Sequence, residues 1–168
     1  MKKVCSLICI CLFLGIGAAL PAWGFDGIDI PALKKQAEQG DPDAQSKLGV
    51  MYASGVGMKM DKKEAVKWYT KSAAQGDPVG MWNLAFMYVR GEGGLEKDYS
   101  KARNLFRNSA EMGFVNAQYD FGIVLLDGVG GEPDKAEAVA WFKKAAEQGS
   151  RDAKKILKEL GEKEPSDK

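Results

Sequence analysis

The residue types that most often carry catalysis are scarce in this chain. The sequence contains no histidine, and its three cysteines, Cys5, Cys9 and Cys11, all lie near the N-terminus. Nucleophile systems that pair a serine or cysteine with histidine need an imidazole base, so the sequence excludes them. Zinc sites of the usual Cys/His kind are excluded from the rest of the chain because it holds neither ligand type.

Two glycine clusters and one group of acids are the remaining candidates for ligand chemistry. Gly91-x-Gly93-Gly94 and Gly128-x-Gly130-Gly131 lack the Lys-Ser/Thr of a phosphate loop, so we interpret them as turns between helices. Asp127, Glu132 and Asp134 are close in sequence, but Ca²⁺ needs six to eight oxygens in a shaped loop. Paired carboxylates for sugar hydrolysis stay open on spacing alone, although nothing singles out a pair. We therefore predict no catalytic residue, no metal and no cofactor.

An apolar stripe is the one feature that suggests a functional surface. Ala44, Leu48 and Tyr52 recur at i, i+4 and i+8, which predicts the buried face of a helix. Positions 46, 50 and 53 point roughly 140–200° away from Leu48, where a surface helix is normally polar. The residues there and at equivalent positions are Ser46, Val50, Ala53, Trp82, Phe86, Val89, Tyr119, Ile123 and Leu126.

Two interpretations of this stripe are open. Its side chains could pack against neighbouring helices, because a helix that is apolar all round is usually buried. Alternatively, they could form an aromatic groove that binds a protein or peptide partner. For the second interpretation the predicted partner-binding residues are Trp82, Phe86, Val89, Tyr119, Ile123 and Val50.

The elements that would position the stripe recur with a period of 36 or 37 residues. Segments of similar sequence end at Gly40, Gly76, Gly113 and Gly149. Each period predicts a first helix, at about 43–54, 79–90 and 116–127, and a second helix that begins after an N-cap aspartate, at Asp61, Asp98 and Asp134. Gly49, Ala85 and Gly122 share one position of the first helices, and an interior glycine, which costs roughly 0.8–1.0 kcal/mol, indicates close helix packing there.

These elements predict an all-α fold: a right-handed α/α superhelical solenoid of three helix-pair repeats with a half-repeat cap at each end. The repeats span about 43–78, 79–115 and 116–151, and the cap helices span 31–39 and 151–160. Together they form one predicted domain, 25–160, followed by a short polar tail, 161–168, that we expect to be disordered.

The N-terminal segment, residues 1–24, has the order of a secretory signal. Lys2 and Lys3 precede an apolar run from Val4 to Leu20, and small residues follow at Ala22 and Gly24. We expect cleavage before Phe25 or Trp23, a periplasmic or secreted product, and no stable membrane anchor afterwards. An uncleaved anchor is the alternative. The formal charge of +1 would become −1 without the two lysines, which gives no case for nucleic acid as a partner.

The pattern Ala44-x-x-x-Leu48-Gly49-x-x-Tyr52-x-x-Gly55-x-Gly57, followed by Asp61-x-x-x-Ala65-x-x-Trp68-Tyr69-x-Lys71-x-Ala73-Ala74-x-Gly76, resembles the Sel-one-like repeat. The resemblance covers about 30–160. It implies a relative of the tetratricopeptide solenoid, with first helices lining the concave side and an adaptor role in complexes, and it fits an exported bacterial member. The middle repeat departs most, with Gly80, Ala85 and Leu105 and one extra residue before Asp98.

We therefore expect an exported adaptor or scaffold that binds protein partners through the concave face of its solenoid, and not an enzyme. The alternative, suggested by loose family association, is a cell-envelope enzyme acting on peptidoglycan or a β-lactam. A purely structural part of an envelope assembly is a third possibility. Family membership does not identify the partner.

Overall fold

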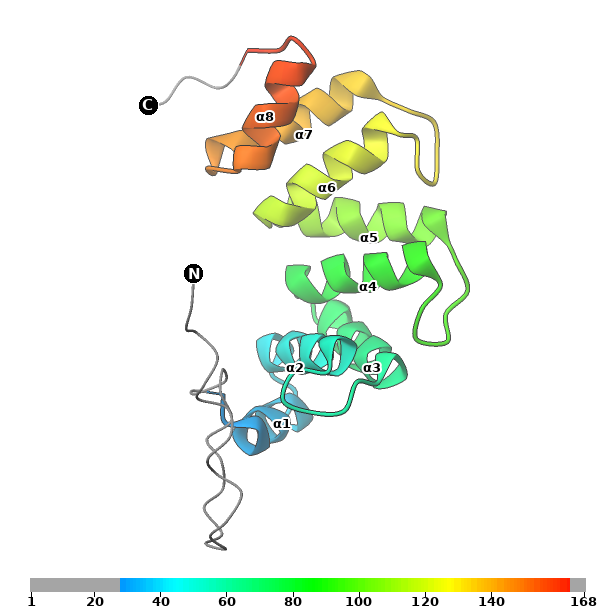
Figure 1. Cartoon of the computed structure of the whole chain (residues 1–168), viewed down its shortest axis with the longest axis vertical. Helices are drawn as coiled ribbons and strands as arrows, with labels where there is room; N and C mark the ends of the chain where they lie inside the picture. Colours follow the sequence, from blue (N-terminus) through cyan, green and yellow to red (C-terminus); the bar gives the residue numbers. More distant parts are fainter. Residues whose placement is uncertain (1–27, 164–168) are drawn as a thin grey trace, which may run out of the picture.

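The structure, a computed structural model, describes residues 28–163, which form eight α-helices and no strand (Figure 1). The helices stack in chain order, and the predicted all-α solenoid is confirmed. Three pairs, α2–α3, α4–α5 and α6–α7, lie between the single helices α1 and α8. The bounds are α1 Ile30–Glu38, α2 Pro42–Ser54, α3 Lys62–Ala74, α4 Pro78–Arg90, α5 Tyr99–Glu111, α6 Val115–Leu126, α7 Lys135–Glu147 and α8 Arg151–Glu159.

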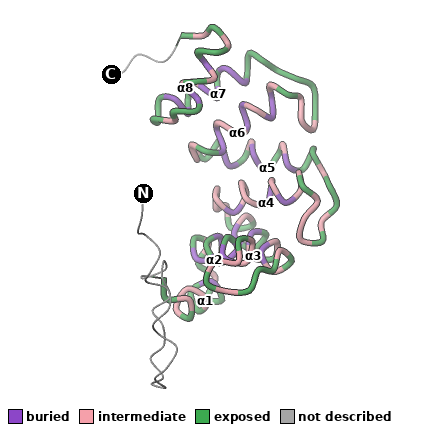
Figure 2. The backbone as a smooth tube through the Cα atoms, viewed as in Figure 1, coloured by how far each residue is buried: buried purple, intermediate pink, exposed green. Residues whose placement is uncertain are grey.

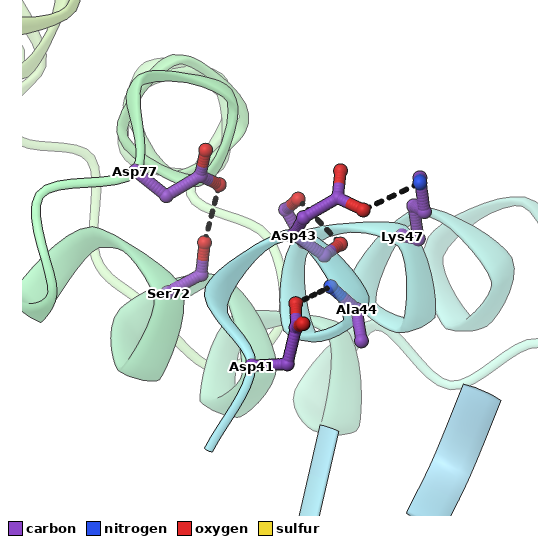
Figure 3. A network of polar contacts seen from close by, with 7 residues as sticks. Asp41, Asp43, Ala44, Lys47, Ser72 and Asp77 are labelled. Carbon is purple, nitrogen blue, oxygen red and sulfur yellow. Dashed lines mark hydrogen bonds and ion pairs between the residues drawn. The ribbon is translucent and has the colours of Figure 1, made fainter. Parts of the chain in front are cut away.

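The second helix of each pair begins at the aspartate that the sequence predicted. The carboxylates of Asp61, Asp98 and Asp134 accept hydrogen bonds from backbone N–H groups in the first turns of α3, α5 and α7. Among the first helices, α2 and α4 are capped in the same way by Asp41 and Asp77 (Figure 3). Each acid satisfies backbone donors that the helix cannot satisfy itself.

α6 lacks the side-chain cap of the other first helices. Its N-cap is Phe114, which makes no side-chain hydrogen bond to the first turn. In α4 the cap Asp77 also accepts a hydrogen bond from the Ser72 hydroxyl at 2.5 Å (Figure 3). The equivalent Ser109 has no carboxylate to bond and donates instead to the carbonyl of Pro78, at 2.6 Å.

Interior glycines allow close contact between the two helices in the outer pairs, α2–α3 and α6–α7. A Cβ placed on Gly49 would lie 2.5 Å from Cε1 of Tyr69, and one on Gly122 would lie 2.5 Å from Cε1 of Phe142. Both rings are buried, so neither can move aside. The close approach predicted from the recurring glycine is therefore present in both outer pairs.

The core runs between the two helices of each pair and between consecutive pairs. Leu48, Leu84 and Phe121, which the periodicity assigned to the core, are 1%, 6% and 0% exposed. The loops after α4 and α6 lie on one side of the stack, and their residues are mostly partly or fully exposed (Figures 1 and 2). The buried surface thus belongs to the helices, as a solenoid requires.

Part of the predicted organisation falls outside the described residues. The proposed signal peptide, 1–24, lies there, as do residues 164–168 of the predicted tail. Between residues 28 and 163, none of the helices has the length and apolar character needed to cross a membrane. The predicted cap helices 31–39 and 151–160 correspond to α1 and α8.

Candidate functional site

The predicted partner-binding residues lie on α2, α4 and α6, and we call them the first-helix surface: Val50, Trp82, Phe86, Val89, Tyr119 and Ile123. Val50 is 42% exposed, and the other five are partly buried and pack against the largest core cluster. None of the six is fully buried. Each side chain therefore contributes to packing and also retains solvent-accessible area.

The two aromatic residues of α4 form the best-defined part of this surface. The rings of Trp82 and Phe86 meet edge to face with centroids 5.1 Å apart, and Trp82 also meets Phe114 at 5.6 Å. Phe86 contacts Phe106 of α5 at 5.0 Å, and Arg90 lies over its face at 5.4 Å. Such contacts hold an aromatic side chain in place at little additional entropic cost on binding.

Trp82 connects α4 to α6 through a polar contact that the sequence analysis missed. Its indole Nε1 donates a hydrogen bond of 2.7 Å to Oδ2 of Asp120. Burial raises the pKa of the Asp120 carboxyl above its usual range, and the Trp82 hydrogen bond partly opposes this. The sequence pattern within one helix does not reveal this contact, because it joins residues 38 positions apart on two different helices.

Tyr119 is the aromatic residue on α6, and its surroundings are acidic. Its ring contacts Phe142 with centroids 5.8 Å apart. Burial raises the pKa of its hydroxyl, and the negative charges of Asp152, Asp120 and Glu159 add to the effect. The aromatic ring of Tyr119 therefore lies within reach of the negative charges of carboxylates on α6 and α8.

One stripe position outside the six predicted binding residues is fully buried. Ser46 on α2 is 1% exposed. Its hydroxyl donates to the carbonyl of Asp43 within the same helix, and α2 packs directly on α4 as well as on α3. At Ser46 the structure therefore agrees with the first interpretation of the stripe, in which its side chains pack against neighbouring helices.

The described residues offer little for catalysis. No group of three or more Cys, Asp or Glu side chains within 28–163 is arranged to hold a metal ion. Acids of the third turn, such as Asp134, serve as helix caps. Tyr69, whose pKa is raised by burial, lies in the core against Gly49.

Stacked helix pairs with a single helix at each end define the class of α-solenoid repeat proteins. Within that class, the chain belongs to the Sel1 repeat family, whose repeat matches residues 42–77, 78–114 and 115–150. Sel1 repeat proteins mediate protein–protein interactions and are typically non-catalytic adaptors. The predicted resemblance is thereby confirmed.

Curated relatives are longer proteins that share this region. Chitin synthase regulatory factor 3 of Schizosaccharomyces pombe is 34% identical over 75% of this chain and 14% of its own length. The Arabidopsis thaliana protein HRD3B, an ERAD-associated E3 ubiquitin-protein ligase component, is 31% identical over 68% of this chain and 18% of its own. The chain thus spans less than a fifth of each of these two relatives. Neither is named as an enzyme of peptidoglycan or β-lactams.

Solved structures show the same architecture in bacterial proteins. A Sel1 repeat protein from Oxalobacter formigenes is 35% identical with a TM-score of 0.70, covering 78% of this chain and 98% of its own. A protective antigen of uropathogenic Escherichia coli with an SLR fold is 39% identical with a TM-score of 0.70, covering 76% of this chain and 27% of its own. Cysteine-rich protein B of Helicobacter pylori, at 24% identity and a TM-score of 0.61, shares the fold.

Proposed function

We propose that this chain is an exported adaptor or scaffold that binds a protein partner on the concave side of its solenoid, through the first-helix surface. The observation that carries the proposal is the pair Trp82 and Phe86, which are held by ring contacts and are still partly exposed. Rigid aromatic side chains of this kind are frequent anchors at protein interfaces. The family and its interaction role support the same reading.

The arrangement of the six residues also favours an extended partner. Trp82, Phe86 and Val89 lie on α4. Tyr119 and Ile123 lie on α6, the first helix of the following pair, and the hydrogen bond from Trp82 to Asp120 joins the two helices. A peptide strand or an amphipathic helix can place several side chains along such a surface. Single exposed apolar residues need no such explanation, but a continuous set does.

Replacing Trp82 separates binding from packing. We expect Trp82→Ala to leave the fold largely intact and to weaken partner binding by about 2 kcal/mol or more, the scale of an interface hot spot. If Trp82 were only a core residue, the same change would lower stability by roughly 3–5 kcal/mol. Thermal melting and affinity, measured on the same protein, distinguish these outcomes.

The matched control for this experiment is Trp68→Ala. Trp68 is another partly buried tryptophan, but it lies on the second helix α3 and packs near Leu48. The Trp68→Ala substitution should affect stability without a specific loss of partner binding.

Crosslinking in cells is a second test of the same surface. A photocrosslinking residue in place of Ile123 should capture the partner in cells, whereas one in place of the exposed Tyr99 should not. Equal capture at both positions would contradict a binding site on the first helices.

Export is the second part of the proposal. The basic start, the apolar run from Val4 to Leu20 and the small residues that follow support removal of residues 1–24. We expect the mature protein to begin at Phe25, or at Trp23, and to occur in the periplasm or outside the cell. Mass spectrometry of the protein from its natural host tests this, and a mature product that retains Lys2 and Lys3 would contradict it.

A further inference from the structure

Asp120 carries a carboxylate that forms no ion pair with a lysine or arginine among residues 28–163. It lies partly buried on α6, where it accepts a hydrogen bond from the indole N–H of Trp82. Within the same residues, no positive charge contributes to lowering its pKa. A carboxylate taken partly out of water without a cation destabilises the folded state.

The negative charge around Asp120 is larger than one carboxylate. Asp152 and Glu159 of α8 act with Asp120 on the hydroxyl of Tyr119. The neighbouring cation, Lys155, is within 3.9 Å of Glu159, in a pair whose side chains are both largely exposed. An exposed pair of this kind is weak, so Lys155 neutralises little of the negative charge that Glu159 contributes beside Tyr119.

The same helix position carries a different charge in each repeat. Lys47, Asn83 and Asp120 stand two residues before Gly49, Ala85 and Gly122. Lys47 pairs with Asp43 on the exposed face of α2 at 2.5 Å (Figure 3), and Asn83 donates to the carbonyl of Val79 in its own helix. Only at α6 is this position an acid without a cation, and there it touches the tryptophan of the neighbouring helix.

From this geometry we infer that the partner carries a lysine or arginine flanked by apolar residues, and that the cation docks against Asp120 between Trp82 and Tyr119. The inference rests on the proposed function, because it names the chemistry of the partner at the same surface. The free oxygen of the carboxylate accepts the ammonium or guanidinium. The aromatic faces of Trp82 and Tyr119 favour a cation and the aliphatic stem that bears it.

Arg90 places a positive charge at one end of the first-helix surface, away from Asp120. It stands two turns beyond Trp82 on α4 and lies over Phe86, so a cation is favoured at the Asp120 end and not at the Arg90 end. Eight helical residues separate Trp82 from Arg90, which corresponds to about 12 Å. A partner segment with its basic residue at one end of an apolar stretch matches this spacing.

A random library of twelve-residue peptides tests the inference without knowledge of the natural partner. The full mature chain selects binders, and the Trp82→Ala protein removes those that bind elsewhere. We expect the remaining peptides to be enriched in lysine or arginine next to apolar residues. For the strongest binder, Asp120→Asn should weaken affinity at least about tenfold, as should replacing the peptide's basic residue by glutamine. The control Asp43→Asn, at a carboxylate already paired with Lys47, should change affinity less than about twofold.

The outcomes separate this inference from the proposed function. Peptides that depend on Trp82 but lack basic residues, or that are acidic, would overturn the inference and leave the proposed function standing. Equal losses from Asp120→Asn and Asp43→Asn would overturn it as well, since a nonspecific charge effect would then suffice. If no selected peptide loses affinity on Trp82→Ala, both the inference and the proposed surface fail.

Discussion

The middle repeat and the two outer repeats carry the interior glycine of their first helix at different positions, against different neighbours. In the outer pairs, Gly49 and Gly122 admit the ring of the pair's own second helix. The middle pair has Ala85 at that position, fully buried, and its glycine is Gly80, five residues earlier. A Cβ on Gly80 would lie 2.2 Å from the hydroxyl of Ser72, which belongs to the preceding pair.

The contact with α3 explains why position 80 is a glycine. The Ser72 hydroxyl, which donates to the α4 cap Asp77, is the nearest atom to a Cβ at this position, and the Ser72 Cβ and the backbone nitrogen of Ala73 follow at 2.7 and 3.0 Å. Ser109 meets Phe114 instead of an acid, turns toward Pro78 and leaves room for Ala117 in α6. The close contact lies within the pair at Gly49 and Gly122 and between pairs at Gly80. The difference teaches that the small residue at a given position of the repeat is set by the local contact of that helix, and that equivalent positions need not carry the same residue.

Truncations in the core should have the largest effect and should not distinguish the repeats. Leu48→Ala, Phe121→Ala and the middle-repeat Leu84→Ala should each lower the free energy of unfolding by roughly 2–5 kcal/mol, through lost contacts and the cavity left behind. Chemical denaturation measures these values. A much smaller loss for Leu84→Ala would mean that the middle pair packs more loosely than its neighbours.

Exchanging glycine and alanine at the shared position of the first helices should destabilise the protein in both directions. Gly122→Ala should destabilise the protein by about 1–3 kcal/mol, because the new Cβ meets the buried ring of Phe142. The reverse change in the middle pair, Ala85→Gly, should cost about 1 kcal/mol from helix propensity, with a further loss of buried contact. Equilibrium unfolding of both variants gives the comparison.

A double-mutant cycle serves as the control for that exchange. Gly80→Ala should be destabilising in the natural background and less so by at least about 0.5 kcal/mol when Ser72→Ala removes the crowding hydroxyl. The same Ser72→Ala change should not improve Gly122→Ala. Additive behaviour at positions 72 and 80 would contradict the crowding between the Ser72 hydroxyl and a side chain at position 80.

Asp120 occupies in the third repeat the position that Lys47 occupies in the first. Of the substitutions discussed, Asp120→Asn should change the free energy of unfolding least. The pKa of Asp120 is raised in the folded protein, so the folded state holds the proton more tightly than the unfolded state. Stability therefore falls as pH rises from about 3.9, the ordinary value, through the folded pKa. Asp120→Asn should raise the melting temperature at pH 7 by a few degrees at most, about 1 kcal/mol or less, and the gain should shrink as pH falls. An Asp120→Asn protein that melts lower at pH 7 would show that the carboxylate is needed for folding.

Much of the fold could be predicted because the chain repeats its own signals. Asp61, Asp98 and Asp134 each mark a helix start, and Gly49 and Gly122 mark a close approach of two helices. A signal that recurs at the same position of the repeat supports an assignment that a single copy would leave ambiguous. The predicted helix pairs and core residues follow from this local information.

The site depended on contacts between repeats, which periodicity within one helix does not contain. Ser46 is buried on α2, which packs on α4, and the hydrogen bond from Trp82 to Asp120 joins side chains of α4 and α6. Angles on a helical wheel placed these residues correctly on their own helices. They could not say which neighbouring helix covers which flank, and that choice separates a packed side chain from an accessible one.

The stacking of helices on their neighbours in sequence has a kinetic consequence. α1 packs on α2, α2 on α3 and so on to α7 and α8, so most contacts join residues that are close along the chain. Chains with such a low contact order fold fast, and a pair of helices can form before the rest of the protein has been synthesised. The same geometry leaves α1 and α8 supported mainly from one side, so backbone amides there should exchange with solvent sooner than those of α4 to α6.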